Sequence, residues 1–146
     1  MIVKQILAMK TGPESIVTVR PDMSVADAAR LLSEKRIGAV VVSEDGQHPA
    51  GILSERDIVR ELGRSGADVL QRKVADLMTS KVSTCVCGED ALTVLQRMTD
   101  GRFRHLPVVD EAGHMLGVVS IGDAVSARLK ELAAEKEALT GMIMGN

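Results

Sequence analysis

Apolar and polar positions follow one another in a pattern that predicts short buried strands alternating with amphipathic helices. A helix is predicted over about 24–35, where apolar residues recur at three- and four-residue spacing and Ser24 and Asp27 form a capping box. A second helix is predicted over about 55–62, with its end at Gly63. Strands are predicted in the β-branched runs at 16–19, 39–43, 51–53 and 82–86. The order of strand, helix, strand, strand and helix predicts an α/β fold in which helices cover a small sheet.

This pattern occurs twice along the chain. The segment Gly51-Ile-Leu-Ser-Glu-Arg-Asp57 recurs as Gly117-Val-Val-Ser-Ile-Gly-Asp123, at an offset of 66 residues. The leading segments 3–7 and 74–78 also correspond, at an offset of 71. One copy of about 60 residues would form only a marginal core. We therefore expect two β-α-β-β-α repeats that pack against each other as a pseudo-two-fold pair.

The domain limits follow from the repeat. We expect the first domain at residues 3–66 and the second at 67–129, with a C-terminal helix extension and tail at 130–146. The glycines and polar residues of 63–68 are typical of a linker between the two copies.

The composition excludes several classes of function. The 18 basic and 20 acidic side chains give a net charge of −2, which argues against nucleic acid as a partner. Phe103 is the only Phe, Tyr or Trp residue, so a planar ligand cannot be held by stacking on several aromatic rings. No apolar stretch approaches the ~20 residues of a membrane span, and two cysteines cannot make a disulfide framework. We expect a protein of a reducing cytoplasm with no membrane partner.

The repeated Gly-x-x-Ser-x-x-Asp sequence has the residue types of a nucleotide site. Ser54 and Ser120 each stand where a buried strand passes into a helix, and the free amides of a first helical turn can hold a phosphate. Asp57 and Asp123 follow one turn later, and a carboxylate can accept hydrogen bonds from both hydroxyls of a ribose. The alternative is an ordinary capping box, which needs the same Ser and Asp. The preceding glycine and the duplication favour the binding site.

These segments resemble the signature of cystathionine-β-synthase (CBS) domains. The resemblance also includes Arg36-Ile-Gly-Ala-Val-Val-Val42, Arg102-Phe-Arg-His-Leu-Pro-Val108 and Pro21-Asp-Met-Ser-Val-Ala-Asp-Ala28, and it extends from Val3 to Leu129. It implies a tandem CBS pair, or Bateman module. Its cleft would bind an adenosine-containing ligand such as AMP, ADP, ATP, NAD or S-adenosylmethionine. No catalytic residue, metal or required cofactor is implied.

The resemblance also implies roles for individual residues. Asp57 and Asp123 would hold the ribose, and Ser54 and Ser120 would approach the ribose or a phosphate. The other implied ligand contacts, which frame the adenine or close the cleft around it, are Thr18, Val19, Ile37, Gly38, Ala39, Val41, Thr84, Cys85, Phe103, Arg104, His105 and Pro107.

The two half-sites differ in sequence. Gly38-Ala39 of the first copy is replaced by Arg104-His105 in the second, and Arg56 is replaced by Gly122. Small residues let a base approach the backbone, whereas an arginine fork suits a phosphate. One nucleotide could therefore meet Arg56 from one copy and Arg104 or His105 from the other. The alternative is that these arginines face solvent.

The histidine and cysteine residues allow two other interpretations, a thiol-dependent enzyme and a zinc site. Cys85 with His105 could form a thiol–imidazole pair of a thiol-dependent enzyme, but no family-like signature surrounds either residue. Cys85 and Cys87 would supply at most two ligands for zinc. His48 and His114 correspond in the repeat and are expected in exposed hairpin turns. We therefore expect a protein that is not an enzyme and holds no metal.

The C-terminal segment predicts a long helix from Asp123 to about Leu139, with 141–146 as a loose end. Val125, Leu129 and Leu132 form a stripe that would pack on its own domain or extend a dimer seam. The sequence thus predicts a regulatory sensor that binds an adenine nucleotide or NAD, forms a homodimer and signals by a change in shape or assembly, with an effector protein as a further partner. The alternative is a ligand-free dimerisation or interaction module.

Overall fold

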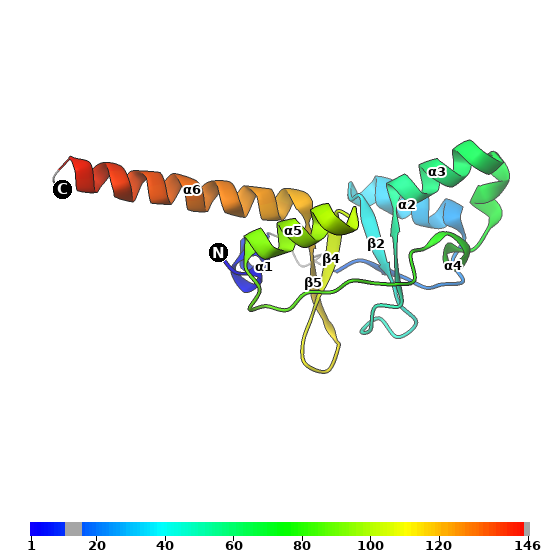
Figure 1. Cartoon of the computed structure of the whole chain (residues 1–146). Coiled ribbons are helices and arrows are strands. Elements are labelled where there is room, and N and C mark those ends of the chain that lie inside the picture. Colours follow the sequence, from blue (N-terminus) through cyan, green and yellow to red (C-terminus); the bar gives the residue numbers. More distant parts are fainter. Residues whose placement is uncertain (11–15, 145–146) are drawn as a thin grey trace.

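The computed structural model describes residues 1–10 and 16–144 as two similar halves that lie side by side (Figure 1). The first half contains a three-stranded sheet in the order β1-β2-β3, in which β1 is parallel and β3 antiparallel to β2. Its elements are β1 (Thr18–Val19), α2 (Val25–Lys35), β2 (Ala39–Val42), β3 (Gly51–Ser54) and α3 (Glu55–Ser65). This order confirms the α/β fold and the predicted β-α-β-β-α unit.

The second half repeats this order with one strand fewer. Its elements are α5 (Ala91–Gly101), β4 (His105–Val109), β5 (Met115–Ser120) and α6 (Ile121–Ile143). Strands β4 and β5 form an antiparallel pair, and the only trace of a third strand among the described residues is an isolated parallel bridge between Cys85 and Val108. The strand predicted over 82–86 is therefore wrong.

Proline explains the missing strand. In the first half the Val41 amide donates to the Val17 carbonyl at 3.2 Å, which joins β1 to β2. Pro107 takes the place of Val41 in the second half, and proline has no N–H to donate. The neighbouring bonds survive, because the Cys85 amide donates to Pro107 and the Val109 amide donates to Cys85, both at 2.9 Å.

Two helix ends differ from the prediction. Helix α3 continues through Gly63 to Ser65 and ends at Gly66, whose φ of 77° is the left-handed conformation that glycine adopts without strain. The segment expected as a linker at 63–68 is helical and not an open loop, since η1 (Ala67–Gln71) follows directly and packs against α3. Helix α6 continues through Gly141, so a loose end beginning there is also wrong; residues 145–146 lie outside the described residues.

The two hydrophobic cores exchange their leading segments. Helix α1 (Val3–Met9) contributes Val3 and Ile6 to the core of the second half and contacts β5 and α6. Residues of η1 and α4 (Val74–Leu77) belong instead to the core of the first half. Each half is thus completed by the segment that precedes the other half in the sequence (Figure 1).

This exchange explains the first residue of the repeated Gly-x-x-Ser-x-x-Asp sequence. A Cβ on Gly51 would lie 2.5 Å from the Met78 sulfur and 3.0 Å from the Thr79 carbonyl oxygen. A Cβ on Gly117 would lie 2.8 Å from the Leu7 side chain, the counterpart of Met78. Both glycines therefore allow a leading segment to approach the strand closely.

Candidate functional site

Both repeated Ser and Asp pairs form capping boxes. The Ser54 amide donates to Asp57 Oδ2 at 3.0 Å and the Asp57 amide donates to Ser54 Oγ at 3.2 Å. The corresponding distances for Ser120 and Asp123 are 2.9 and 3.1 Å. These bonds begin α3 and α6, as the capping interpretation predicted. Capping uses one oxygen of each carboxylate and does not exclude a ligand at the other.

A cavity of about 1230 Å³ lies between the two halves beside the first capping box. Its size is above the ~300–1,000 Å³ usual for small-molecule sites. The first half contributes Ser54, Asp57 and Gly38, and the second half contributes Arg104 and His105. A Cβ on Gly38 would lie 3.5 Å from His105 Cε1, so the two equivalent strand starts face each other across the boundary.

The structure separates the seventeen residues of the expected site into two groups. Those that line the cavity between the halves are Gly38, Ser54, Arg56, Asp57, Phe103, Arg104 and His105. Those that do not line it are Thr18, Val19, Ile37, Ala39, Val41, Thr84, Cys85, Pro107, Ser120 and Asp123. Val19, Val41 and Cys85 are no more than 3% exposed. Val19 and Cys85 belong to the hydrophobic cores of the first and second halves.

Three cavity cations were missed by the sequence prediction. Arg60, Lys81 and Arg102 also line the cavity. Arg60 Nη2 donates to Asp57 Oδ1 at 2.6 Å, one helical turn along α3. The repeat itself contained the signal for Lys81, because Lys81 and Lys10 correspond at the offset of the leading segments. Arg60 carried no such signal, since its counterpart in the second copy is Ser126.

The cavity is strongly cationic although the chain as a whole is slightly acidic. Its charged lining consists of five cations, Arg56, Arg60, Lys81, Arg102 and Arg104, and two carboxylates, Glu55 and Asp57. Burial, assisted by nearby Lys10, lowers the pKa of His105, so its imidazole is neutral near pH 7. This excess of positive charge suits an anionic ligand, and a phosphate in particular.

In the second half, the capping oxygen of the equivalent carboxylate is paired with a lysine. Lys10 Nζ donates to the Val118 carbonyl at 2.7 Å and lies 3.0 Å from Asp123 Oδ2. Burial of Asp123 opposes ionisation, but the Ser120 amide and Lys10 together hold the pKa of this carboxyl below its ordinary value. Asp123 therefore remains charged and paired.

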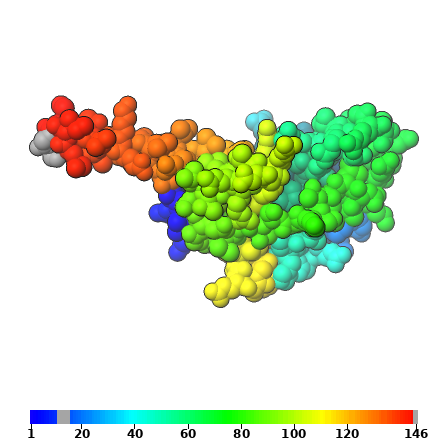
Figure 2. Space-filling view, viewed as in Figure 1, coloured from blue at the N-terminus to red at the C-terminus, as the bar shows by residue number. Residues whose placement is uncertain are grey.

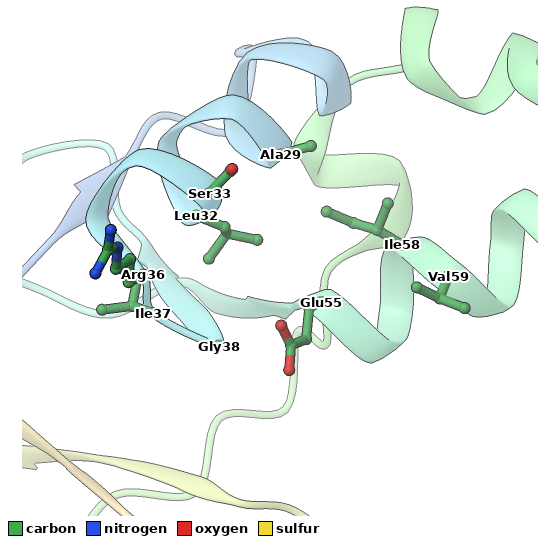
Figure 3. A pocket seen from close by; sticks show the side chains of 9 residues that line it. All are labelled: Ala29, Leu32, Ser33, Arg36, Ile37, Gly38, Glu55, Ile58 and Val59. Atoms are coloured by element: carbon green, nitrogen blue, oxygen red, sulfur yellow. The ribbon is translucent and has the colours of Figure 1, made fainter.

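A smaller cavity of about 530 Å³ lies between α2 and α3 within the first half (Figure 3). Leu32, Ile58 and Val59 supply apolar walls, and Glu55 and Arg36 are its charged residues. It also contains Ile37 and Gly38 of the expected site. Glu55 and Gly38 line both cavities, so this apolar space is close to the larger cavity.

The thiol and the histidines lack the features of a reactive centre. Burial raises the pKa of the Cys85 thiol to about 12, whereas a nucleophilic cysteine needs a lowered pKa. His48 and His114 meet in the hairpin turns, with ring centroids 4.7 Å apart and Asp45 beside His48. Within the part of the chain that the structure describes, no group of three or more His, Cys, Asp or Glu side chains could hold a metal ion.

The helices of residues 1–10 and 16–144 include none with the length and apolar character that a membrane span requires.

Comparison with known proteins agrees with this architecture. The family model for the CBS domain matches residues 3–64 and 74–130. The mitochondrial CBS domain-containing protein CBSX3 of Arabidopsis thaliana is 38% identical over 140 residues, which cover 93% of this chain and 68% of that protein. The crystal structure of the CBS-domain containing protein ATU1752 from Agrobacterium tumefaciens is 40% identical, with a TM-score of 0.81, and the match covers 88% of this chain and 99% of that one.

A third relative has been solved with a nucleotide. The crystal structure of CBSX2 in complex with AMP is 28% identical, with a TM-score of 0.70, over 86% of this chain and 96% of that one. The fold and the paired half-sites thus define a tandem α/β module. The chain belongs to the CBS domain family, of which it contains two copies.

Proposed function

We propose that the protein is a regulatory sensor that binds an adenine nucleotide, AMP in the first instance, in the cavity beside Asp57. The observation that carries this proposal is the cavity itself: a helix start with a Ser and Asp pair faces five cations drawn from both halves. The AMP complex of the related CBSX2 supports the choice of ligand.

In this proposal, each polar group of the cavity contacts a particular part of the nucleotide. At the start of α3, the Glu55 amide donates to the Gly38 carbonyl and the Asp57 amide donates to Ser54 Oγ. The Arg56 amide and the hydroxyl of Ser54 are therefore the donors for a phosphate or ribose oxygen. Asp57 keeps Oδ2 on its cap, and Oδ1, now paired with Arg60, is the acceptor for a ribose hydroxyl. A ribose there releases Arg60, whose guanidinium then becomes available to a phosphate.

Signalling follows from the position of the cavity between the halves. A ligand shifts a protein only when it binds one arrangement better than another. Because Arg56 belongs to the first half and Arg104 to the second, a phosphate held by both favours arrangements in which the halves are close. The output is a change in the relative position of the halves, which an effector protein or a second copy of the chain can recognise.

The test is calorimetric titration of AMP into the wild-type protein and into Asp57→Asn. Hydrogen bonds to a charged acceptor are worth about 1.5–3 kcal/mol each, so the variant should bind AMP at least ~10-fold more weakly. Asp76→Asn is the matched control, because Asp76 caps α4 in the same way outside the cavity. Parallel titrations of ADP, ATP, NAD and S-adenosylmethionine rank the ligands. Absence of binding by all five would reject the sensor in favour of a ligand-free interaction module.

We further propose that the chain forms a homodimer through α6. Ala124 and Ala127 face its own domain, whereas Val125, Leu129 and Leu132 are 41–61% exposed, so packing of this stripe on its own domain is wrong. The same spacing places Lys136 next and then continues to Leu139 and Ile143, which are also exposed.

The far end of α6 projects from the body of the molecule (Figure 2), and a helical segment without tertiary contacts is marginal in water. A second copy provides the matching apolar stripe. Light scattering after size exclusion should report a dimer for the wild type and a monomer for Leu129→Glu. Lys130→Glu, beside the stripe, should remain dimeric. A monomeric wild type would contradict the homodimer and leave the nucleotide site untouched.

We also propose that the protein is not an enzyme, because the buried Cys85 thiol has a raised pKa and a neutral thiol is a poor nucleophile. The reducing cytoplasm expected from two free cysteines stays a prediction.

A further inference from the structure

Most of the cations that line the cavity between the halves have no counter-ion in the described chain. Arg60 is paired with Asp57. The other cations of the lining make no side-chain hydrogen bond or ion pair with any of residues 1–10 and 16–144: Arg56, Lys81, Arg102 and Arg104. Like charges that share one cavity repel each other, and an anion bound among them removes this repulsion. The lining therefore favours a ligand with several negative charges.

This positive charge is more than one phosphate can neutralise. The lining contains five cations and two carboxylates, an excess of three positive charges. A phosphate monoester carries a charge of about −1.5 to −2 at pH 7. AMP would therefore leave at least one positive charge without a partner, whereas a nucleotide with a second phosphate would bring a further negative charge into the cavity.

The unpaired cations fall into two groups by their place in the fold. Arg56 lies in the first turn of α3, at the helix start to which the ribose and the first phosphate are assigned. The other three come from outside this helix start. Lys81 lies in the segment after α4, and Arg102 and Arg104 lie immediately before β4. This second group is therefore available to a second phosphate.

Arg102 also has an unusual backbone conformation. It ends α5 with a φ of 57° and a ψ of 39°, the left-handed conformation that glycine adopts easily and arginine rarely. A Cβ on Gly101 would overlap the ring of Phe103, so this ring packs directly on the Gly101 backbone across the turn. The turn itself does not require an arginine, because glycine at position 102 would fit it with less strain. The side chain of Arg102 can thus be removed without disturbing the turn.

We infer that Lys81, Arg102 and Arg104 form a second phosphate subsite, so that the cavity binds adenine nucleotides with two or more phosphates more tightly than AMP. This inference rests on the proposed nucleotide function of the Asp57 cavity and extends it by naming the class of ligand. The ribose and the first phosphate lie at the start of α3. The two guanidinium groups and the ammonium group donate to the oxygens of the second phosphate.

The first test compares AMP with ADP in calorimetric titrations of the wild-type protein. Divalent cations are left out, because they would neutralise the phosphates. One charge-assisted hydrogen bond to the second phosphate is enough for ADP to bind about 10-fold more tightly than AMP. Equal affinities, or tighter binding of AMP, would overturn the inference and leave the proposed function intact. Absence of binding by both nucleotides would contradict the proposed function as well.

The second test removes the guanidinium group of Arg102. Arg102→Gly should weaken ADP binding by about 10-fold and leave AMP binding nearly unchanged. Arg36→Gly is the matched control, because Arg36 ends α2 in the same left-handed conformation, with a φ of 54°, and does not line the larger cavity. This control should keep the wild-type affinities for both nucleotides.

Thermal unfolding without nucleotide separates a lost contact from a lost fold. Glycine is favoured in the left-handed conformation, so neither Arg102→Gly nor Arg36→Gly should lower the melting temperature. Wild-type ADP affinity in Arg102→Gly, or an equal loss of affinity for ADP and AMP, would overturn the assignment of Arg102 to a second phosphate. The comparison of AMP with ADP in the wild type needs no variant and tests the subsite even where Arg102→Gly is unstable.

Discussion

The two halves share one element order but present their acidic residues differently. In the first half, Asp57 opens onto a cavity and its second oxygen is held by Arg60, a residue on the same helix. In the second half, Asp123 is held by Lys10, which arrives from a distant part of the sequence. The same seven-residue signature therefore produces one acid that lines a cavity and pairs with an arginine, and one acid that pairs with a lysine. The segments that pack around the signature determine which cation its carboxylate pairs with.

The two sheets also differ although they belong to the same repeated unit. Val41 joins β2 to β1 through its amide, whereas Pro107 leaves only the bridge at Cys85. One residue thus converts a three-stranded sheet into a two-stranded one. Gly51 and Gly117, by contrast, keep the same function, because each admits a leading segment at close range.

The largest effect is expected from exchanging the residues that distinguish the sheets. Val41→Pro removes the hydrogen bond to the Val17 carbonyl from the centre of the first sheet and should lower the free energy of unfolding by about 3 kcal/mol. Pro107→Val restores a donor and should raise it by about 0.5–1.5 kcal/mol. Urea unfolding followed by circular dichroism measures both. Equal and small effects would mean that the missing strand has a different cause.

A smaller effect is expected at the two glycines. Gly51→Ala places a methyl group against the Thr79 backbone as well as Met78, and overpacking of this kind costs about 2 kcal/mol. Gly117→Ala meets only the flexible side chain of Leu7 and should cost about 1 kcal/mol. The same urea titrations provide the comparison. A greater loss for Gly117→Ala would contradict the role assigned to the Thr79 backbone.

A third effect, similar in size to that at Gly117, concerns pH. Burial raises the pKa of Cys85 to about 12, so the unfolded chain loses this proton first as pH rises above the ordinary thiol value. Stability from this group is complete at neutral pH and is lost progressively as pH rises toward 12, by about 1–2 kcal/mol at pH 10. Cys85→Val, which copies Val19 of the first half, should unfold with a smaller difference between pH 7 and pH 10. Cys87→Ser should retain the wild-type difference.

Local patterns were sufficient to predict the fold. The offset repeat, the Ser24 and Ser54 caps and the β-branched runs determined the element order. The sequence pattern failed at Pro107, where a single missing amide hydrogen prevents the predicted strand. It also failed where a glycine was taken as the end of a helix. Gly63 and Gly141 lie inside exposed helices, where glycine costs only ~1 kcal/mol and tertiary context outweighs it.

The site was predicted only in part because the residues that pair with its two aspartates lie outside the motif. Ser54, Asp57 and Arg104 could be placed from their own segments. The residues that pair with Asp57 and Asp123 could not be placed in this way. Arg60 reaches Asp57 through a side-chain conformation, and Lys10 reaches Asp123 through the exchange of leading segments. Long-range pairings of this kind leave no periodic trace in a sequence.

The exchange of leading segments has a consequence for how the polypeptide folds during its synthesis. The interior of the first half requires Val69, Val74 and Leu77, so it cannot close until the ribosome has released residues well beyond Ser65. Helix α1 is made first but must wait for β5 and α6 before its apolar face is covered. Neither half is therefore an independent building block, and a cut between residues 66 and 67 would leave two fragments that each lack part of their interior.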